Sequence, residues 1–257
     1  MLQLEFYGTS AAYPDGRRGY SCIGMRKDGD LTLLDCGDGA VHNLIRFRAD
    51  LLSIRNIFIT HYHSDHISGL VSLIETMGIL KRTTELGILG PRGIKKYFDI
   101  IQKITHVAEH RKFKITLTEL QAHEKLTIDG LNASAFPLQH SIDCFGYRIE
   151  AINEKRERIV VSYSGDTEPC SESLKLSKDA DFLIHEATFL AKGVAYARLS
   201  KHSTALEAAK TAKRANAKRL ILTHTSFYNP MEKTLSEAKT AFPNVKIAYD
   251  GLVVRCL

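Results

Sequence analysis

The sequence predicts an α/β sandwich, and three observations lead to that fold class. Short apolar runs of strand length, such as residues 57–59 and 159–163, alternate with segments whose apolar residues recur at helical spacing. Imidazole and carboxylate side chains repeatedly follow the ends of these strands. The 257 residues, 44% of them hydrophobic, are enough to bury a large core within one domain spanning residues 1–257.

Composition indicates a cytoplasmic protein with no membrane partner. Five cysteines are scattered without C-x-x-C spacing, as is typical of reduced thiols. The start, MLQLEFYGTS, lacks the basic segment and long apolar run of a signal peptide, and no run approaches transmembrane length. The net charge of +6 favours a polyanionic partner only mildly, because an ordinary basic enzyme has the same composition.

The N-terminal segment predicts three strands followed by a helix. Strand patterns cover residues 2–7, 21–25 and 31–34, with a hairpin turn at Asp28 and Gly29. The third strand leads into Asp35, and apolar residues at helical spacing begin at Val41. Asp35 could hydrogen-bond a ligand histidine or cap this helix, and the sequence leaves both roles open.

The densest group of candidate metal ligands follows the strand at residues 57–59. Here the sequence reads THYHSDH, with His61, His63, Asp65 and His66 in an H-x-H-x-D-H pattern. Helical spacing resumes directly afterwards, so the four side chains occupy a strand-to-helix loop. Solubility alone does not explain this density of ligands, and the pattern predicts a metal site.

The remaining chain predicts alternating strands and helices. His106 and His110 are interpreted as surface residues, because their neighbours are basic and no carboxylate accompanies them. Helices are expected at residues 94–104 and 205–216. Strands are expected at residues 86–89, 115–118, 126–128, 132–136, 145–149, 159–163, 181–184, 219–223, 245–249 and 252–254.

Three further candidate ligands stand just past predicted strands, so we expect them to meet the first group at one sheet edge. We assign His61, His63 and His140 to one cation. Asp65, His66 and His224 are assigned to a second cation, and the carboxylate of Asp166 is expected to bridge the two. Zinc suits these ligands, with manganese and iron as alternatives. Such a pair could generate a bridging hydroxide and stabilise both oxygens of an in-line displacement, which predicts phosphodiester hydrolysis.

Segments along nearly the whole chain match a known family: FYGTSAAYP, LLDCGDG, THYHSDHISGL, GPRGIKKY, PLQHSIDCFGYRIE, SYSGDTEPC, HEATF, KHSTALEAAK and LILTHTSFY. The chain resembles the metallo-β-lactamase superfamily and, within it, the ribonuclease Z group, which removes 3′ trailers from precursor tRNA. HEATF followed by HST is the most specific feature. The resemblance implies an αββα sandwich of two mixed sheets flanked by helices, two zinc ions, an RNA substrate, namely precursor tRNA, and a homodimer.

The resemblance also implies roles for three side chains. His202 is similar to the family's histidine beside the scissile phosphate, which stabilises charge or protonates the leaving 3′ oxygen. Glu186 is similar to the carboxylate that orients this histidine, and Asp65 to a base discussed for the hydroxide. Spacing alone would instead make His202 a helix-start histidine with a local contact.

Two segments depart from the ribonuclease Z pattern. Between His140 and Asp166 the usual tRNA-binding arm is replaced by a segment long enough only for a hairpin, and residues 225–229 lack the usual arginine-tyrosine pair. An alternative is therefore an armless phosphodiesterase acting on cyclic nucleotides or short oligonucleotides. A non-catalytic RNA-binding protein, or the armless half of a hetero-oligomer, is disfavoured because no ligand is missing. A lactam or thioester hydrolase is disfavoured by Glu186 and His202.

Overall fold

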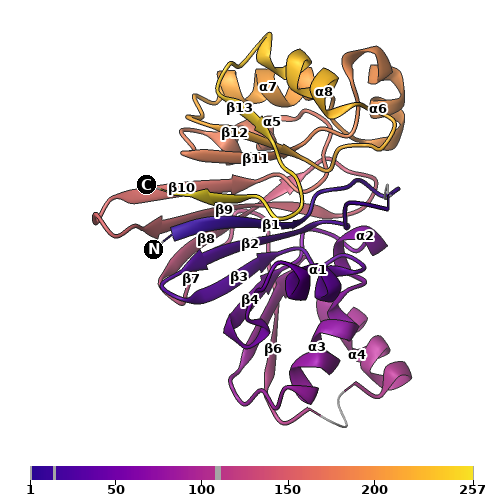
Figure 1. Cartoon of the computed structure of the whole chain (residues 1–257), viewed down its shortest axis with the longest axis vertical. Helices are drawn as coiled ribbons and strands as arrows, with labels where there is room; N and C mark the ends of the chain where they lie inside the picture. The colour runs from indigo at the N-terminus through magenta and orange to yellow at the C-terminus, as the bar shows by residue number, and fades with distance from the viewer. Residues whose placement is uncertain (1, 14–15, 108–110, 257) are drawn as a thin grey trace.

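The computed structural model describes residues 2–13, 16–107 and 111–256 and contains two seven-stranded sheets that face each other. Helices cover the outer face of each sheet (Figure 1). The predicted αββα sandwich is confirmed. Of the two histidines assigned to the surface, His106 is exposed, whereas His110 lies outside the described residues.

The first sheet comes mainly from the N-terminal half of the chain. Its outer face is covered by α1 (Ala40–Arg46), α3 (Leu70–Ile79) and α4 (Ile94–Thr105), with the short elements η1 (Leu51–Ser53) and α2 (Ser64–Ile67) in the connections. The C-terminal strand β14 pairs antiparallel with β1 at the edge, and β3 to β6 run parallel. In spatial order the strands are β14 (Val253–Arg255), β1 (Leu2–Gly8), β2 (Cys22–Lys27), β3 (Asp30–Leu34), β4 (Ile54–Phe58), β5 (Leu86–Gly90) and β6 (Ile115–Glu119).

The second sheet combines an antiparallel half with a parallel half. Strands β7 to β10 pair antiparallel, whereas β10 to β13 run parallel. Between His140 and Asp166, where the tRNA-binding arm was expected to be missing, the strands β9 and β10 form a hairpin. The order is β13 (Val245–Ile247), β12 (Leu220–Thr223), β11 (Phe182–Glu186), β10 (Arg158–Tyr163), β9 (Cys144–Ile152), β8 (Leu131–Leu138) and β7 (Lys125–Ile128).

The helices beside the second sheet include three that the sequence analysis missed. Helices α5 (Ser171–Ser177) and α6 (Val194–Ser200) have seven residues each, too few for a clear apolar period, and α8 (Met231–Lys239) follows Pro230. The short η2 (Ala191–Gly193) precedes α6. Helix α7 (Ala205–Arg214) ends before the predicted residue 216, because Asn216 adopts a left-handed conformation with φ of 55°. No helix within the described residues is long and apolar enough to cross a membrane.

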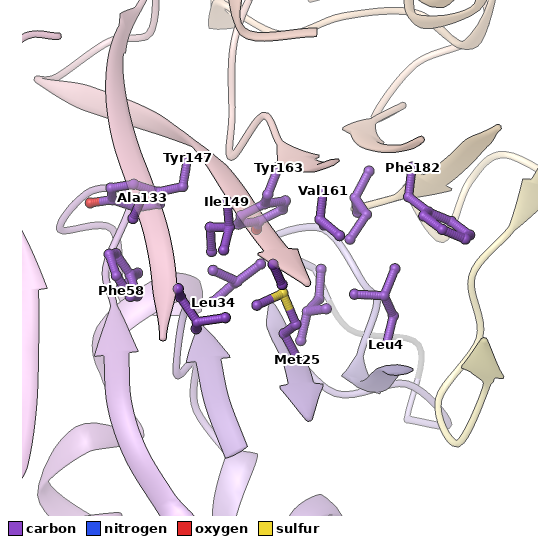
Figure 2. Packing of buried hydrophobic residues seen from close by; sticks show 14 of the residues in the cluster. Leu4, Met25, Leu34, Phe58, Ala133, Tyr147, Ile149, Val161, Tyr163 and Phe182 are labelled. Atoms are coloured by element: carbon purple, nitrogen blue, oxygen red, sulfur yellow. The ribbon is translucent and has the colours of Figure 1, made fainter. Parts of the chain in front are cut away.

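The core between the sheets holds them face to face (Figure 2). Leu4, Met25 and Phe58 from the first sheet contact the layer that contains Tyr147 and Tyr163 from the second. Burying a side chain of this size contributes roughly 1.5–3 kcal/mol. The Tyr147 hydroxyl also donates to the Ile59 carbonyl oxygen at 2.6 Å, which ties β9 to the chain just before His61. The core therefore sets how the strand ends of the two sheets meet.

Candidate metal centre

The candidate ligands come from loops that follow strands of both sheets. His61 follows β4, His140 follows β8, Asp166 follows β10 and His224 follows β12. Strands β10, β11 and β12 are parallel neighbours, so their carboxyl ends lie at one edge of the second sheet. The structure brings all seven predicted ligands together there, in two adjacent groups.

Cluster A contains His61, His63 and His140, whose ligand atoms all lie within 4.8 Å of one another. His63 Nδ1 is 3.1 Å from His61 Nε2 and 3.1 Å from His140 Nε2. Nitrogens that share a tetrahedral zinc at about 2.0–2.1 Å stand about 3.3 Å apart, so the three fit one ion. Burial lowers the pKa of His61 and of His140, which favours the neutral imidazole that a metal requires.

Cluster B contains Asp65, His66, Asp166 and His224, all of them buried. His66 Nε2 lies 3.3 Å and His224 Nε2 3.4 Å from Asp166 Oδ2. The same oxygen is 3.8 Å from His61 Nε2 of cluster A. Asp166 therefore lies between the two clusters, where a bridging carboxylate would have to be.

Two polar atoms in cluster B test whether the site suits a cation. Within the described part of the chain, His66 Nε2 and Asp166 Oδ1 are buried without a hydrogen-bond partner. Burial would raise the pKa of Asp166, but the imidazoles of His224 and His66 hold it well below its usual value. A buried carboxylate and an unpartnered imidazole nitrogen are costly unless something binds them, and a cation satisfies both.

Of the two roles predicted for Asp35, a helix cap or a hydrogen bond to a ligand histidine, the structure shows the second, with His66. His66 Nδ1 donates to Asp35 Oδ2 at 2.7 Å, which leaves Nε2 directed at cluster B. The backbone N–H of Thr60 and the Tyr163 hydroxyl donate to the same carboxylate at 2.7 and 2.8 Å. The capping role was wrong, because the N-cap of α1 is Gly39.

The glycine after Asp35 permits the close approach of two loops. A Cβ on Gly37 would collide with the Asp65 carbonyl oxygen, so a larger residue would push the LLDCGDG loop away from the metal loop. The N–H of Cys36 donates to the His66 carbonyl oxygen at 2.8 Å across the same contact. The two loops are thus packed directly on each other.

Backbone and hydroxyl groups orient two other imidazoles. His140 Nδ1 donates to the Lys201 carbonyl oxygen at 3.0 Å, so its Nε2 is left for cluster A. The Thr188 hydroxyl lies 2.9 Å from His224 Nδ1 and donates to Glu186 Oε2 at 2.7 Å. Sequence reasoning missed Lys201 and Thr188. Their only signal was proximity to His202 and Glu186 in the motifs KHST and HEATF.

Glu186 and His202 form an ion pair at the mouth of the centre. His202 Nδ1 lies 2.8 Å from Glu186 Oε1, which also accepts the Thr167 N–H at 2.9 Å. The His202 ring stacks on His224 at 5.5 Å between centroids, and Nδ1 is 3.9 Å from Asp166 Oδ2. Burial lowers the pKa of His202, but Glu186 outweighs this effect and raises it to about 9. The carboxylate of Glu186 therefore favours the protonated form of this imidazole.

A cavity of about 680 Å³ opens beside cluster A. His140 forms part of its wall, together with Arg92, Gln139 and the ion pair of Lys201 and Glu168, whose charged atoms are 2.6 Å apart. Its volume is within the range of pockets that bind small ligands. The cavity beside the centre, lined by apolar residues as well as by these polar and charged ones, is thus large enough for a nucleotide-sized group.

Comparisons with known proteins agree with this geometry. A sequence profile described as "Beta-lactamase superfamily domain" matches residues 32–225. Ribonuclease Z of Methanothermobacter thermautotrophicus is 33% identical, with 99% of this chain and 96% of the relative aligned. The short form of human tRNase Z superposes with a TM-score of 0.82 at 29% identity, over 98% of both chains. YhfI of Bacillus subtilis, described as a metallo-β-lactamase fold protein, superposes with a TM-score of 0.83 at 25% identity, again over 98% of both.

Proposed function

Because this chain belongs to the metallo-β-lactamase superfamily, we propose that it is a di-zinc phosphodiesterase of the ribonuclease Z type. Metal-dependent hydrolysis follows from the fold, the family and the His/Asp clusters. The proposed reaction is endonucleolytic removal of the 3′ trailer of precursor tRNA. The likeness to ribonuclease Z of M. thermautotrophicus and to human tRNase Z supports this substrate.

One observation carries the proposal: the Glu186–His202 pair lies directly beside Asp166. Departure of a 3′ oxygen from phosphorus requires a proton, and a positioned imidazolium supplies one. Glu186 Oε1 accepts a hydrogen bond from the Nδ1–H of His202, which leaves the Nε2–H to protonate the leaving oxygen.

The proposed ligands divide the remaining work. His61, His63 and His140 would hold one cation, Asp65, His66 and His224 the other, with Asp166 shared. When bound, such a pair supplies an activated water and stabilises negative charge on the oxygens around phosphorus. Asp35, Thr188 and the Lys201 carbonyl keep the imidazoles aimed at these positions. Asp65, held 3.2 Å from His224 Nε2, would also accept the proton from the attacking water.

The proposal treats residues 1–257 as one catalytic domain, because ligands from both sheets complete the centre. It also keeps the homodimer that the resemblance to the ribonuclease Z group implies. The short β9–β10 hairpin favours a second candidate, an armless phosphodiesterase acting on cyclic nucleotides or short oligonucleotides. In that case the cavity beside His140 would hold most of the substrate.

A comparison of substrates tests the proposal. Zinc-loaded protein is offered a precursor tRNA with a 3′ trailer, a cyclic nucleotide and bis(p-nitrophenyl) phosphate, and kcat/KM is measured for each. A single cut near the discriminator base, at the highest kcat/KM, supports ribonuclease Z activity. Turnover of the two small substrates with uncut tRNA supports the second candidate. Absence of turnover on all three, with metal bound, contradicts both.

A further inference from the structure

The loop that follows His224 is joined to the N-terminal loop. Thr225 forms an isolated parallel bridge with Ser10, and the Ala11 N–H donates to the Thr225 carbonyl oxygen at 3.3 Å. The Arg18 guanidinium donates to the same oxygen at 3.2 Å. Asn229 Nδ2 donates to the Thr188 carbonyl oxygen at 2.9 Å and holds the far end of the loop. Both loops are thereby anchored beside cluster B.

Three aromatic rings meet where these loops touch, and we call Tyr13, Phe227 and Tyr228 the aromatic platform. The centroid of Tyr13 is 6.1 Å from Phe227 and 6.1 Å from Tyr228, and the latter two are 5.5 Å apart. The rings are packed on one another, yet Tyr13, Phe227 and Tyr228 are 62%, 51% and 75% exposed. Three adjacent exposed aromatic residues leave a large apolar area in water, which usually marks a binding surface.

The position of the aromatic platform indicates what it binds. Phe227 is three residues past His224, so its Cα lies at most about 11 Å from that of His224. The cavity described above is beside His140, whose ring centroid is 5.0 Å from that of His202. The His202 centroid is in turn 5.5 Å from that of His224. The aromatic platform therefore lies next to the loop that carries His224, at residues that do not line this cavity. A phosphodiester chain that crosses the centre would continue onto it.

We propose that the aromatic platform stacks an unpaired base of the nucleic acid next to the scissile phosphate. This rests on the proposed phosphodiesterase function. Proteins that hold single strands combine exposed aromatic faces with basic groups, and the Arg18 side chain lies in the same loop contact. Stacking of a base on an aromatic ring depends little on sequence, because every base has a flat π-face. The aromatic platform supplies part of the substrate grip that the short β9–β10 hairpin cannot supply.

The chain contains no tryptophan, which permits a binding test that does not depend on catalysis. Tyr228→Trp places a single indole on the aromatic platform, and Tyr196→Trp places one at a matched control position on α6, where the tyrosine is 70% exposed. Each zinc-loaded variant is titrated with a single-stranded RNA that carries phosphorothioate linkages, and with its abasic counterpart. We expect the base-containing RNA, and not the abasic strand, to quench the fluorescence of Tyr228→Trp saturably. Neither strand should quench the fluorescence of Tyr196→Trp appreciably.

A kinetic test uses variants that keep apolar side chains but remove the rings. The double variant Phe227→Leu, Tyr228→Leu should lower kcat/KM for an RNA substrate about tenfold, as expected for loss of one stacked base. On a substrate that is abasic beside the cleavage site the effect should disappear, and Tyr196→Leu should change neither value. Tyr228→Trp, which keeps an aromatic ring on the platform, should lose less kcat/KM than the double leucine variant.

Several results would overturn the inference. Equal quenching by the abasic strand would mean that the phosphates, not the bases, bind there. Quenching that depends on protein concentration without RNA would mean that a second copy of the chain occupies the platform. If RNA quenches the Tyr228→Trp fluorescence saturably but the protein cuts no RNA, the platform binds bases and ribonuclease Z activity is rejected. Failure of this inference and failure of the proposed function can therefore be told apart.

Discussion

His202 Nδ1 lies 2.8 Å from Glu186 Oε1, although the two residues are 16 positions apart in the chain. Glu186 is the last residue of β11 and is fully buried, whereas His202 lies in the loop before α7. The contact fixes a partly exposed imidazole beside Asp166 and raises its pKa. Neither residue could do this alone, because the carboxylate needs a cationic partner and the imidazole needs an orienting one.

His202→Ala should keep its metal and lose most of its turnover. The alanine removes a proton donor that is not among the proposed ligands, and loss of general acid catalysis lowers kcat by about 10²–10⁴-fold. Metal content by elemental analysis and kcat on the best substrate check this. Glu186→Gln should lower kcat in the same direction while also retaining metal. Loss of metal from His202→Ala would mean that this histidine is a ligand.

Asp166→Ala should lose bound metal as well as activity. The carboxylate lies between the two clusters, with its Oδ2 3.3 Å from His66 and 3.8 Å from His61, so its removal weakens both proposed sites. Metal content after dialysis should fall by at least one ion per chain relative to wild type. If Asp166→Ala and His202→Ala retain metal equally, the division between ligand and proton donor is wrong.

Asp35→Asn should weaken metal binding without removing a ligand. The carboxylate accepts the Nδ1 proton of His66, and loss of such an orienting partner typically costs 10- to 100-fold in metal affinity. Competition with a chelator measures the change. Asp38→Asn, on the exposed part of the same loop, is the matched control and should bind metal like wild type. Unchanged affinity in Asp35→Asn would show that His66 keeps its orientation without this contact.

Glu5, on β1, should make the free energy of unfolding depend on pH. Burial would raise the pKa of Glu5, but hydrogen bonds from Arg26, Tyr7 and Gln3 outweigh it and hold the pKa below 4.5. A carboxyl whose pKa is lowered on folding stabilises the protein above its unfolded pKa. This contribution is lost as the pH falls through the lower, folded value.

Urea unfolding between pH 7 and pH 3 tests this effect. Glu5→Gln should be about 1–2 kcal/mol less stable than wild type at pH 7, since the charged partner of Arg26 is lost from a partly screened pair. The difference should shrink below about pH 4.5. Glu75→Gln, an exposed position on α3, should follow wild type throughout. A constant difference between Glu5→Gln and wild type would mean that the carboxyl is not titrating.

Local patterns in the sequence were sufficient for most strands and for the loop that carries His61 to His66. Alternating or continuous apolar residues followed by turn residues located the strands to within a few positions, because this spacing reflects which face is buried. The short helices α5, α6 and α8 gave too little periodicity to be recognised. The resemblance to a family, not spacing, singled out His202.

The chain alone determined which side chains could bind metal, and that four of them share one loop. It left open whether Asp35 caps a helix or orients His66, and for the contacts of Lys201 and Thr188 it offered only their proximity to His202 and Glu186. Those relationships arise only when two sheets pack face to face and bring the ends of β4, β8, β10 and β12 together. Hydrogen bonds such as Asp35–His66 join residues distant in sequence, so their existence depends on packing that no local pattern encodes.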